Sequence, residues 1–358
     1  MQMEPQADIA YSAGDWILNS GIQEASGGVA RFYLTDRQDN AAISTEITGY
    51  SASTFVDMYQ CTADRRFLDA ARKAADYLNR AWQTDASAMP FECEPSIPQY
   101  TYLFDNGIIV RGLLAVWRAC GDATSLETAK RIAGSMRQDF HTGQEFSPIL
   151  DLPAKSKVPY EQRWSRSPGC YQLKAGLAWR QLWEITQDES DLAPYLELLN
   201  LSVSTHNAFL PGADSEALVM DRLHAYCYFL EGLLPVAQER TFGDVLASGI
   251  RQVAELVSRI GPKVLRSDVV AQLLRIRLFA DQYGMLALDL NAAAGEAALL
   301  QSFQVKRENR RVHGGFWFAR TAEGLLPFVN PVSTAFSYQA LRMWSARQQD
   351  TLDWRLLI

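Results

Sequence analysis

The sequence is poor in the features that mark several large classes of protein. Its four histidines do not pair with cysteines at the spacing of a zinc site, and it has no Asp-rich diphosphate motif and no glycine-rich phosphate loop. We therefore expect neither a metal nor a cofactor. The five cysteines are an odd set without C-x-x-C spacing, which favours reduced thiols and a cytoplasmic location.

Long apolar runs and runs of like charge are also missing. No segment approaches the roughly 18 uninterrupted apolar residues of a membrane span, and residues 1–22 lack the pattern of a secretory signal. The net charge of -7 argues against nucleic acid as a partner. No tract has the composition of a flexible linker, so we expect one domain over residues 1–358. The oligomeric state is left open.

What the sequence does contain is an alternation of two kinds of helical segment. One kind is amphipathic, with the 3.6-residue apolar period of a helix that has one solvated face. These segments are 8–19, 64–82, 125–140, 189–205, 241–260 and 282–303. The other kind is apolar nearly all round and should be buried on every side. Those segments are 47–59, 107–119, 171–185, 224–236, 269–280 and 332–344.

Strict alternation predicts an all-α (α/α)6 toroid of six inner and six outer helices, with short β-hairpins in the long loops. A weak internal repeat, in which residues 61–71 align with 120–129, supports a repeated helical hairpin. An open solenoid is the main alternative. The long links at 20–43, 84–103, 140–168 and 305–330 lead into inner helices. We therefore expect binding residues at the amino ends of those helices, where free N–H groups favour anionic groups.

Two acidic residues stand at the starts of consecutive inner segments, Glu46 and Asp105. Two carboxyls in one enclosed mouth can take different pKa values and so divide acid and base roles. A separation of roughly 5–5.5 Å would suit a retaining glycosidase and about 6.5–9.5 Å an inverting one. The alternative is that both carboxylates only bind the free amides of a helix end.

The stretch from Phe104 to Ile109, with Asp105-Asn106 at its centre, resembles the start of an inner helix in unsaturated glucuronyl hydrolases. The resemblance to the six-hairpin glycosidase-like superfamily covers almost the whole chain in its architecture. It implies that Asp105 is a general acid/base. Glu46 stands where that family has a second acidic residue, an Asp, and the family's His-Asp neighbourhood is missing here.

The loop before residue 171 offers groups that could hold an acidic sugar. Arg163 and Arg166 flank Trp164, which combines carboxylate binding with a stacking plane. Tyr102, Asn106, Tyr171, Asp268 and Asn330 stand at helix starts as further candidates for substrate binding. The alternative for the loop is a surface segment anchored by Trp164, and Asp268 is equally an N-cap.

His224 opens an apolar segment, and related toroids that epimerise sugars use histidines to move a proton beside a carbonyl. A core histidine satisfied by its neighbours is the alternative. His313, a further candidate for substrate binding, precedes Gly314-Gly315, in a stretch that echoes Gly27-Gly28 and its following aromatics. Those aromatics could line a saccharide cleft or form short β-hairpins.

The leading prediction is a glycoside hydrolase that acts on an acidic oligosaccharide or glycan end. Asp105 and Glu46 would supply the chemistry, and the saccharide would be the partner. The alternatives are a sugar epimerase or isomerase that uses His224, and a non-catalytic protein of glycan binding or polysaccharide assembly.

Overall fold

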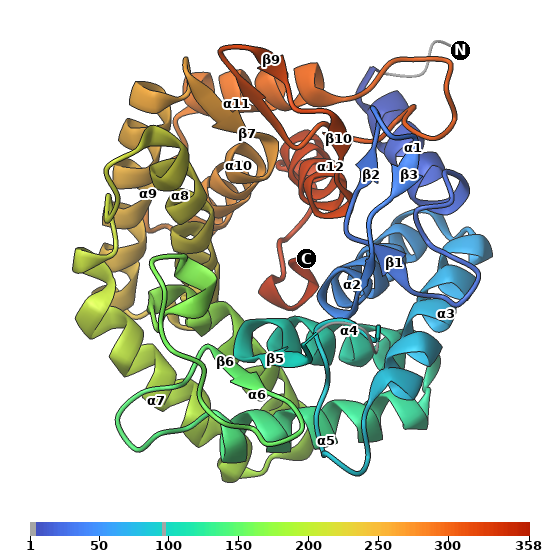
Figure 1. The fold of residues 1–358 in the computed structure, drawn as a ribbon. Coiled ribbons are helices and arrows are strands. Elements are labelled where there is room, and N and C mark those ends of the chain that lie inside the picture. Colours follow the sequence, from blue (N-terminus) through green and yellow to red (C-terminus); the bar gives the residue numbers. More distant parts are fainter. Residues whose placement is uncertain (1–4, 95–97) are drawn as a thin grey trace. The chain divides into compact units, whose positions relative to one another are not determined.

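The computed structural model describes residues 5–94 and 98–358 and is almost entirely helical (Figure 1). Its residues group into two compact units. Unit 1 comprises the described residues up to Ile22, together with Phe32–Ala41 and Ala208–Ile358. Unit 2 comprises Gln23–Arg31 and Ala42–Asn207.

Unit 2 contains three helical hairpins. Its helices are α2 (Thr45–Thr62), α3 (Arg65–Ala81), α4 (Leu103–Cys120), α5 (Ala123–Asp139), α6 (Leu173–Thr186) and α7 (Glu189–Thr205). Within each hairpin the two helices pack together, and α4 also packs on both α2 and α6. Helices α2, α4 and α6 are buried over most of their residues, whereas α3, α5 and α7 keep a solvated face, as their sequence patterns predict.

All three hairpins of unit 2 turn in the same way. The first helix ends on a left-handed residue, at Ala63 (φ 57°), Gly121 (φ 73°) or Gln187 (φ 57°). An aspartate follows directly, and its carboxylate accepts a backbone N–H from the first turn of the next helix. A left-handed C-cap followed by an Asp N-cap satisfies both helix ends in a short link. This shared turn is the physical basis of the repeat in the sequence.

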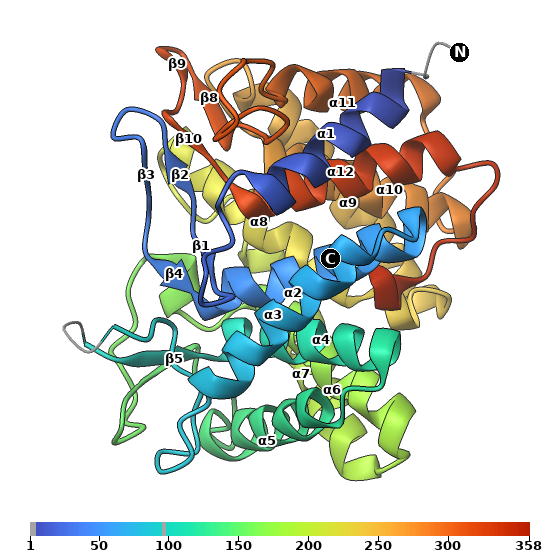
Figure 2. The ribbon, with the colours of Figure 1, turned by 90° about the vertical axis from the view of Figure 1, so that its right-hand side faces the viewer.

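Unit 1 contains the other six helices that the described residues form. They are α1 (Pro5–Asn19), α8 (Glu216–Gly232), α9 (Arg240–Ile260), α10 (Ser267–Gln282), α11 (Leu290–Phe303) and α12 (Pro331–Ala346). Helix α10 packs on α8, α9, α11 and α12, and α12 also packs on α1 (Figure 2). Among these described residues, α8, α10 and α12 are the largely buried helices.

Short antiparallel strands fill the long loops, as predicted. In unit 2, β1 (Val29–Ala30) pairs with β4 (Ile43–Ser44), and β5 (Tyr100–Tyr102) pairs with β6 (Ile149–Asp151). In unit 1, β2 (Tyr33–Leu34) pairs with both β3 (Asp39–Asn40) and β10 (Phe328–Val329). Strand β8 (Ala319–Thr321) pairs with both β7 (Val264–Arg266) and β9 (Gly324–Leu325). Strands β4, β5, β7 and β10 lead directly or almost directly into α2, α4, α10 and α12.

Two predicted helix starts are wrong. Helix α8 begins at Glu216 and not at His224, because the Ser215 hydroxyl caps it by accepting the Leu218 N–H (3.3 Å). Helix α11 begins at Leu290 and not at residue 282, since the chain turns through Gly284 (φ 71°) and Asp289 then caps the helix. In the part of the chain that the structure describes, no helix combines the length and apolarity that crossing a bilayer requires.

Candidate functional site

Glu46 and Asp105 lie in the first turns of α2 and α4, which pack on each other. Burial raises the pKa of Glu46 to about 7, although the positive charges of Arg31 and Arg163 oppose this. Burial also raises the pKa of Asp105 well above its usual value, and the neighbouring Glu46 carboxyl raises it further. The two carboxyls therefore interact, and a pair of this kind can hold a proton at neutral pH.

The local backbone also binds one of these carboxyls. Tyr102 is the N-cap of α4 and its side chain gives no capping hydrogen bond. The Asp105 carboxylate accepts a hydrogen bond from its own backbone N–H, which opposes the rise in its pKa. Asp105 therefore has the helix-end contact that the alternative predicts, together with a proton affinity that such a contact alone would not produce.

Arg31 and Glu92 belong to this cluster and were missed by the sequence reasoning. The Nη2 of Arg31 lies 2.8 Å from the Oε1 of Glu92, and its guanidinium lies over the ring of Phe91 at 5.4 Å. Arg31 follows the Gly27-Gly28 turn that the sequence marks as unusual. Glu92 carries no comparable signal, because only the folded chain brings it to residue 31.

The loop before α6 brings Arg163, Trp164, Arg166 and Tyr171 to the same part of unit 2. The Trp164 ring meets Tyr171 edge-on at 4.9 Å between centroids and Phe104 at 6.2 Å, so its position is fixed by packing. Arg163 is exposed, forms no ion pair with another described residue, and acts on both carboxyls through its charge.

Arg166 and the two tyrosines are less free. Arg166 lies 2.5 Å from the Oε1 of Glu161 and hydrogen bonds with Tyr102. Burial raises the pKa of Tyr102, and it raises that of Tyr171 well above the usual range; the negative charge of Asp105 adds to both effects. Both phenols therefore stay protonated near neutrality, and that of Tyr171 donates to the Ser167 carbonyl (3.0 Å).

Asn106 joins the start of α4 to the strand before it. Its Nδ2 donates to the Thr101 hydroxyl (2.8 Å) and to the Tyr102 carbonyl (2.9 Å). These two acceptors fix the orientation of the amide. The Oδ1 atom is buried and has no hydrogen-bond partner among the described residues, so it is an acceptor held in a defined position.

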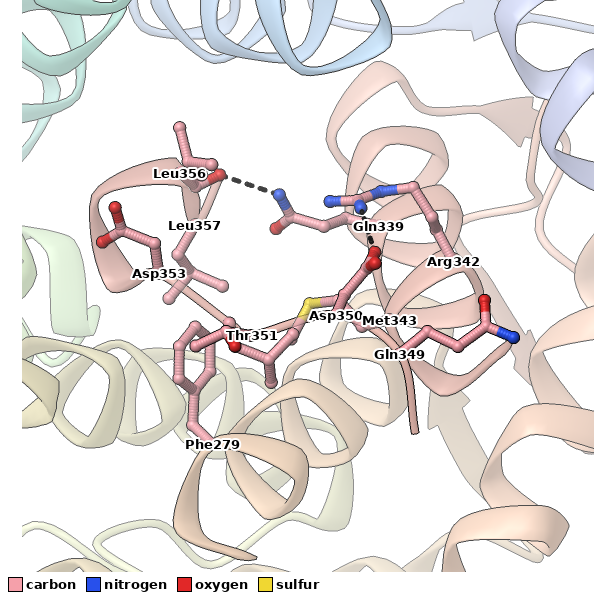
Figure 3. A pocket seen from close by; sticks show the side chains of 11 residues that line it. Phe279, Gln339, Arg342, Met343, Gln349, Asp350, Thr351, Asp353, Leu356 and Leu357 are labelled. Carbon is pink, nitrogen blue, oxygen red and sulfur yellow. Dashed lines mark hydrogen bonds and ion pairs between the residues drawn. The ribbon is translucent and has the colours of Figure 1, made fainter. Parts of the chain in front are cut away.

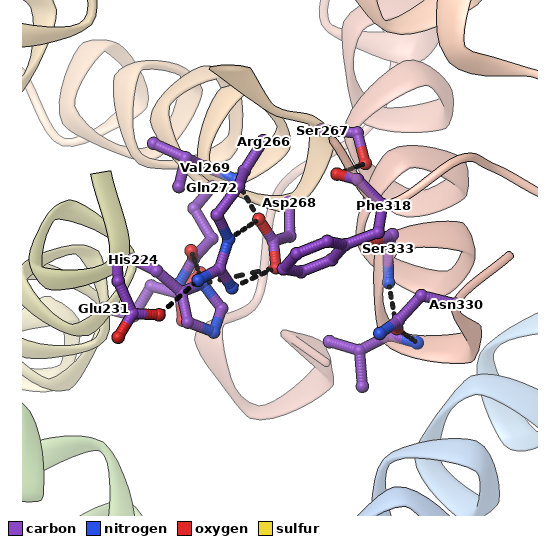
Figure 4. A network of polar contacts seen from close by, with 12 residues as sticks. His224, Glu231, Arg266, Ser267, Asp268, Val269, Gln272, Phe318, Asn330 and Ser333 are labelled. Carbon is purple, nitrogen blue, oxygen red and sulfur yellow. Dashed lines mark hydrogen bonds and ion pairs between the residues drawn. The ribbon is translucent and has the colours of Figure 1, made fainter. Parts of the chain in front are cut away.

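Unit 1 contains a second polar cluster, centred on His224 (Figure 4). The Nδ1 of His224 lies 2.7 Å from the Oε1 of Gln272 and 3.6 Å from the Oδ2 of Asp268. Because both oxygens accept, Nδ1 carries the proton and Nε2 is the basic nitrogen. Burial lowers the pKa of His224 to about 4, although Asp268 opposes this shift, so the ring is neutral at neutral pH.

Asp268 is held by Arg266 and is not the N-cap of α10. Arg266 donates to both of its carboxylate oxygens, from Nε (3.0 Å) and Nη2 (2.6 Å), and also binds Asp221 (2.5 Å). Burial alone would raise the pKa of Asp268, but Arg266, His224 and the Val269 N–H together outweigh it, and the pKa falls below its usual value. Asp268 is therefore ionised, and it orients the imidazole together with Gln272.

The other predicted residues of unit 1 have structural contacts. Asn330 is the N-cap of α12, and its Oδ1 accepts the N–H groups of Val332 (2.8 Å) and Ser333 (3.1 Å). His313 is exposed in the loop before β8. His224 lies eight residues after the start of α8 at Glu216, so the amino end of that helix does not act on it directly.

The two glycine-aromatic stretches contribute to a common aromatic stack in unit 1. Phe328 in β10 lies against Phe32 (4.9 Å between centroids) and against Phe318 (5.0 Å). Arg266 covers the other side of Phe318 at 4.5 Å from the ring centroid. All three rings are half-buried, and their contacts join the loops around β2, β8 and β10.

The predicted residues thus divide between the two units. Glu46, Tyr102, Asp105, Asn106, Arg163, Trp164, Arg166 and Tyr171 belong to unit 2, and His224, Asp268, His313 and Asn330 to unit 1. A cavity of about 300 Å³ lies in unit 1 beside the last turns of α10 and α12, and none of these residues lines it (Figure 3). Within the described ranges, no three His, Cys, Asp or Glu side chains are grouped as metal ligands.

Comparisons with known proteins show a likeness in structure. No protein-family model and no curated protein matches the chain. A sugar epimerase from a ruminal bacterium is similar with a TM-score of 0.72 at 11% identity, over 98% of this chain and 100% of that one. The cellobiose 2-epimerase of Spirochaeta thermophila gives a TM-score of 0.72 at 14% identity, over 95% and 97% of the two chains. The GH76A alpha-1,6-mannanase of Salegentibacter gives a TM-score of 0.60 at 12% identity, over 96% and 99%.

At such low identities the likeness concerns the fold alone. The chain is an all-α protein of the (α/α)6 toroid class, as the alternation of its helices predicts. More particularly, it shares its fold with these two epimerases and with this mannanase.

Proposed function

We propose that the protein is a carbohydrate-active enzyme, and specifically a glycoside hydrolase that acts on an acidic oligosaccharide or a glycan end. One arrangement carries the proposal: Glu46 and Asp105 lie in the first turns of two helices that pack on each other, and the pKa of each carboxyl is raised. The fold supports it, because proteins with this architecture and with names that state activity on sugars are among the structural neighbours.

The two carboxyls suit different roles. Asp105, whose pKa is raised well above its usual value by burial, would donate a proton to the glycosidic oxygen as the bond to the anomeric carbon breaks. Glu46, with a pKa of about 7, would be ionised in part of the molecules. It would take a proton from an attacking water in an inverting reaction, or attack the anomeric carbon itself in a retaining one.

The basic and aromatic side chains of unit 2 favour an anionic sugar. Arg163 is exposed and has no carboxylate partner among the described residues, so a uronate would supply its counter-ion. Trp164 is held by Phe104 and Tyr171 and would contact the apolar face of a sugar ring. Tyr102 is half-buried and would bind a hydroxyl group, while the buried Asn106 and Tyr171 would support the backbone around it.

Asp105→Asn tests the proposal directly. With a panel of uronate-containing and neutral oligosaccharides, we expect hydrolysis of an acidic member, and a turnover that falls by about 10²–10⁴-fold in the variant. The melting temperature should not fall, because the amide keeps the size of the side chain and removes the cost of ionising a buried carboxyl. Asp69→Asn, on the exposed face of α3, is the matched control and should hydrolyse at the normal rate. An unchanged rate in Asp105→Asn would remove this residue from the mechanism.

The second candidate is a sugar epimerase or isomerase that uses His224. The observation that favours it is a buried, neutral imidazole whose Nδ1 is fixed by Gln272 and Asp268, which leaves Nε2 to accept a proton. Solvent deuterium would then enter a carbon-bound position of a free sugar without cleavage of a glycosidic bond, and His224→Asn would abolish that exchange. Binding without turnover or exchange would instead favour a glycan-binding protein.

A further inference from the structure

We propose that Arg31 is a positioning residue of the candidate site, in which one guanidinium is shared between the buried carboxyl of Glu92 and the carboxyl of Glu46. Through Arg31, Glu92 would alter the proton affinity of Glu46, although Glu92 is not a member of the Glu46–Asp105 pair. The catalytic meaning of this arrangement rests on the proposed function, whereas the charge coupling itself does not.

The backbone of Arg31 is fixed close to the start of α2. Strand β1 pairs with β4, with Ala30 opposite Ile43, and the Arg31 N–H donates to the Ala42 carbonyl (3.1 Å). Strand β4 ends at Ser44, which caps α2. The residues just before Glu46 are therefore hydrogen-bonded to the residues just before Arg31, which holds the two side chains in one neighbourhood.

The segment that carries Glu92 is fixed to the same place. The Thr45 hydroxyl donates to the Pro90 carbonyl (2.7 Å), and the Thr45 N–H donates to the Phe91 carbonyl (3.1 Å). The Phe91 N–H donates to the Tyr100 carbonyl (2.8 Å), which ties the segment to β5, the strand before α4. Glu92 is thus positioned by the starts of both helices that carry the acidic pair.

Arg31 is a positive charge close to two carboxyl groups, those of Glu92 and Glu46. Glu92 is only 6% exposed, and the Nη2 of Arg31 lies 2.8 Å from its Oε1. Glu94 adds a negative charge beside Glu92. The charged groups that act on Glu46 are Arg31, Arg163 and Asp105. Each of the two carboxyls competes for the same guanidinium, so a change in one alters the other.

This competition predicts shifts of opposite sign. Arg31→Met removes a positive charge, so the Glu46 titration midpoint should rise by about one pH unit. Glu92→Gln leaves the charge of Arg31 uncompensated, so the midpoint should fall. In the double variant the effect of Glu92→Gln should nearly disappear, because the residue that transmits it is gone. Arg65→Met, an exposed arginine of α3, is the matched control and should leave the midpoint unchanged.

The midpoint is read without substrate, from carboxyl carbon chemical shifts of protein labelled at glutamate Cδ. Glu46→Gln assigns the Glu46 signal, which is needed because burial also raises the pKa of Glu296 to about 7. Two shifts of the same sign, or a Glu92→Gln effect that persists in the double variant, would overturn the proposal. If Arg31→Met does not fold, the downward shift in Glu92→Gln still decides the matter.

Activity then separates this inference from the proposed function. Where a substrate is turned over, the pH limb governed by Glu46 should move with the titration midpoint in each variant. Opposite midpoint shifts in a protein without glycoside hydrolysis would support the charge coupling and overturn the hydrolase. Glycoside hydrolysis with a Glu46 titration midpoint that is unchanged in both variants would support the proposed function and overturn the charge coupling.

Discussion

A buried carboxyl group is costly to ionise, and Glu46 carries that cost in the first turn of α2. Its pKa of about 7 lies above the ordinary 4.5 of a glutamate in an unfolded chain. Between these two pH values the folded state binds more protons than the unfolded state. The stability that Glu46 contributes is therefore complete below about pH 4.5 and is lost as the pH rises through 7.

Glu46→Gln should consequently stabilise the protein at high pH. The amide cannot ionise, so the free energy of unfolding of the variant should exceed that of the wild type by roughly 1–3 kcal/mol at pH 8.5. The difference should vanish near pH 4. Urea unfolding at several pH values measures it, with Glu127→Gln on the exposed face of α5 as the control. A difference that does not depend on pH would show that the pKa of Glu46 is not raised in the folded protein.

The sequence predicts the site residues that a local pattern marks, and it misses those that only contacts between distant segments bring together. Glu46 and Asp105 are predictable because each stands at the start of an apolar helical segment. Arg31 and Glu92 are not, because strand pairing and the tie between Thr45 and Phe91 bring them together. Arg266 lies only two residues before Asp268 in the sequence, but the hydrogen bond between them is visible only in the folded chain.

The start of α8 shows why one helix boundary was misjudged. Asp221 and Arg222 make its first turns polar, so the sequence pattern favours a loop there. In the folded chain Arg222 donates to the Phe209 carbonyl from both Nε (2.9 Å) and Nη2 (2.7 Å), and Asp221 binds Arg266. Tertiary contacts thus compensate the charges, and the helix extends back to Glu216.

The packing of helices in unit 2 depends on small residues. A Cβ atom added at Gly112 of α4 would lie 2.4 Å from the Gly49 carbonyl oxygen of α2, and one at Gly107 would lie 2.4 Å from the Cα of Ala175 in α6. Backbone atoms cannot move aside as a flexible side chain can. These glycines therefore set how closely α2, α4 and α6 approach.

Gly112→Ala should destabilise the protein by at least about 1–3 kcal/mol, the usual cost of overpacking a core. Gly134→Ala in α5 is the matched control, because nothing lies within 4 Å of the added Cβ. Alanine favours a helix over glycine, so the control should gain about 0.5–1 kcal/mol. Chemical unfolding of the two variants gives the comparison. Equal effects would mean that α2 and α4 are not in close contact at Gly112.

The fold class follows from the order of helices, whereas the irregular loops do not follow from it. Alternation of apolar and amphipathic segments requires only local periodicity, and the three turns at Asp64, Asp122 and Asp188 carry their own capping signals. Residues 140–168 and 305–330 lack such a period. Their strands are two or three residues long, and β6, β8 and β10 pair with strands elsewhere in the chain. The sequence therefore predicts short hairpins in these loops but neither their positions nor their partners.

That the chain is one domain remains a prediction, and the way it passes between the two units supports it. Unit 1 is built from three stretches and unit 2 from two, so neither is a continuous segment that can fold before the rest of the chain. We therefore expect one cooperative transition in calorimetry, with equal calorimetric and van't Hoff enthalpies.

Arg275→Met in unit 1 would break a fully buried ion pair with Glu231 (2.6 Å) and cost about 3–5 kcal/mol. Gly112→Ala perturbs unit 2. Each variant should lower the temperature at which backbone amides lose their protection from hydrogen exchange, and by the same amount in both units. If Arg275→Met lowers the transition of unit 1 alone and leaves the amides of α4 protected, the chain consists of two domains.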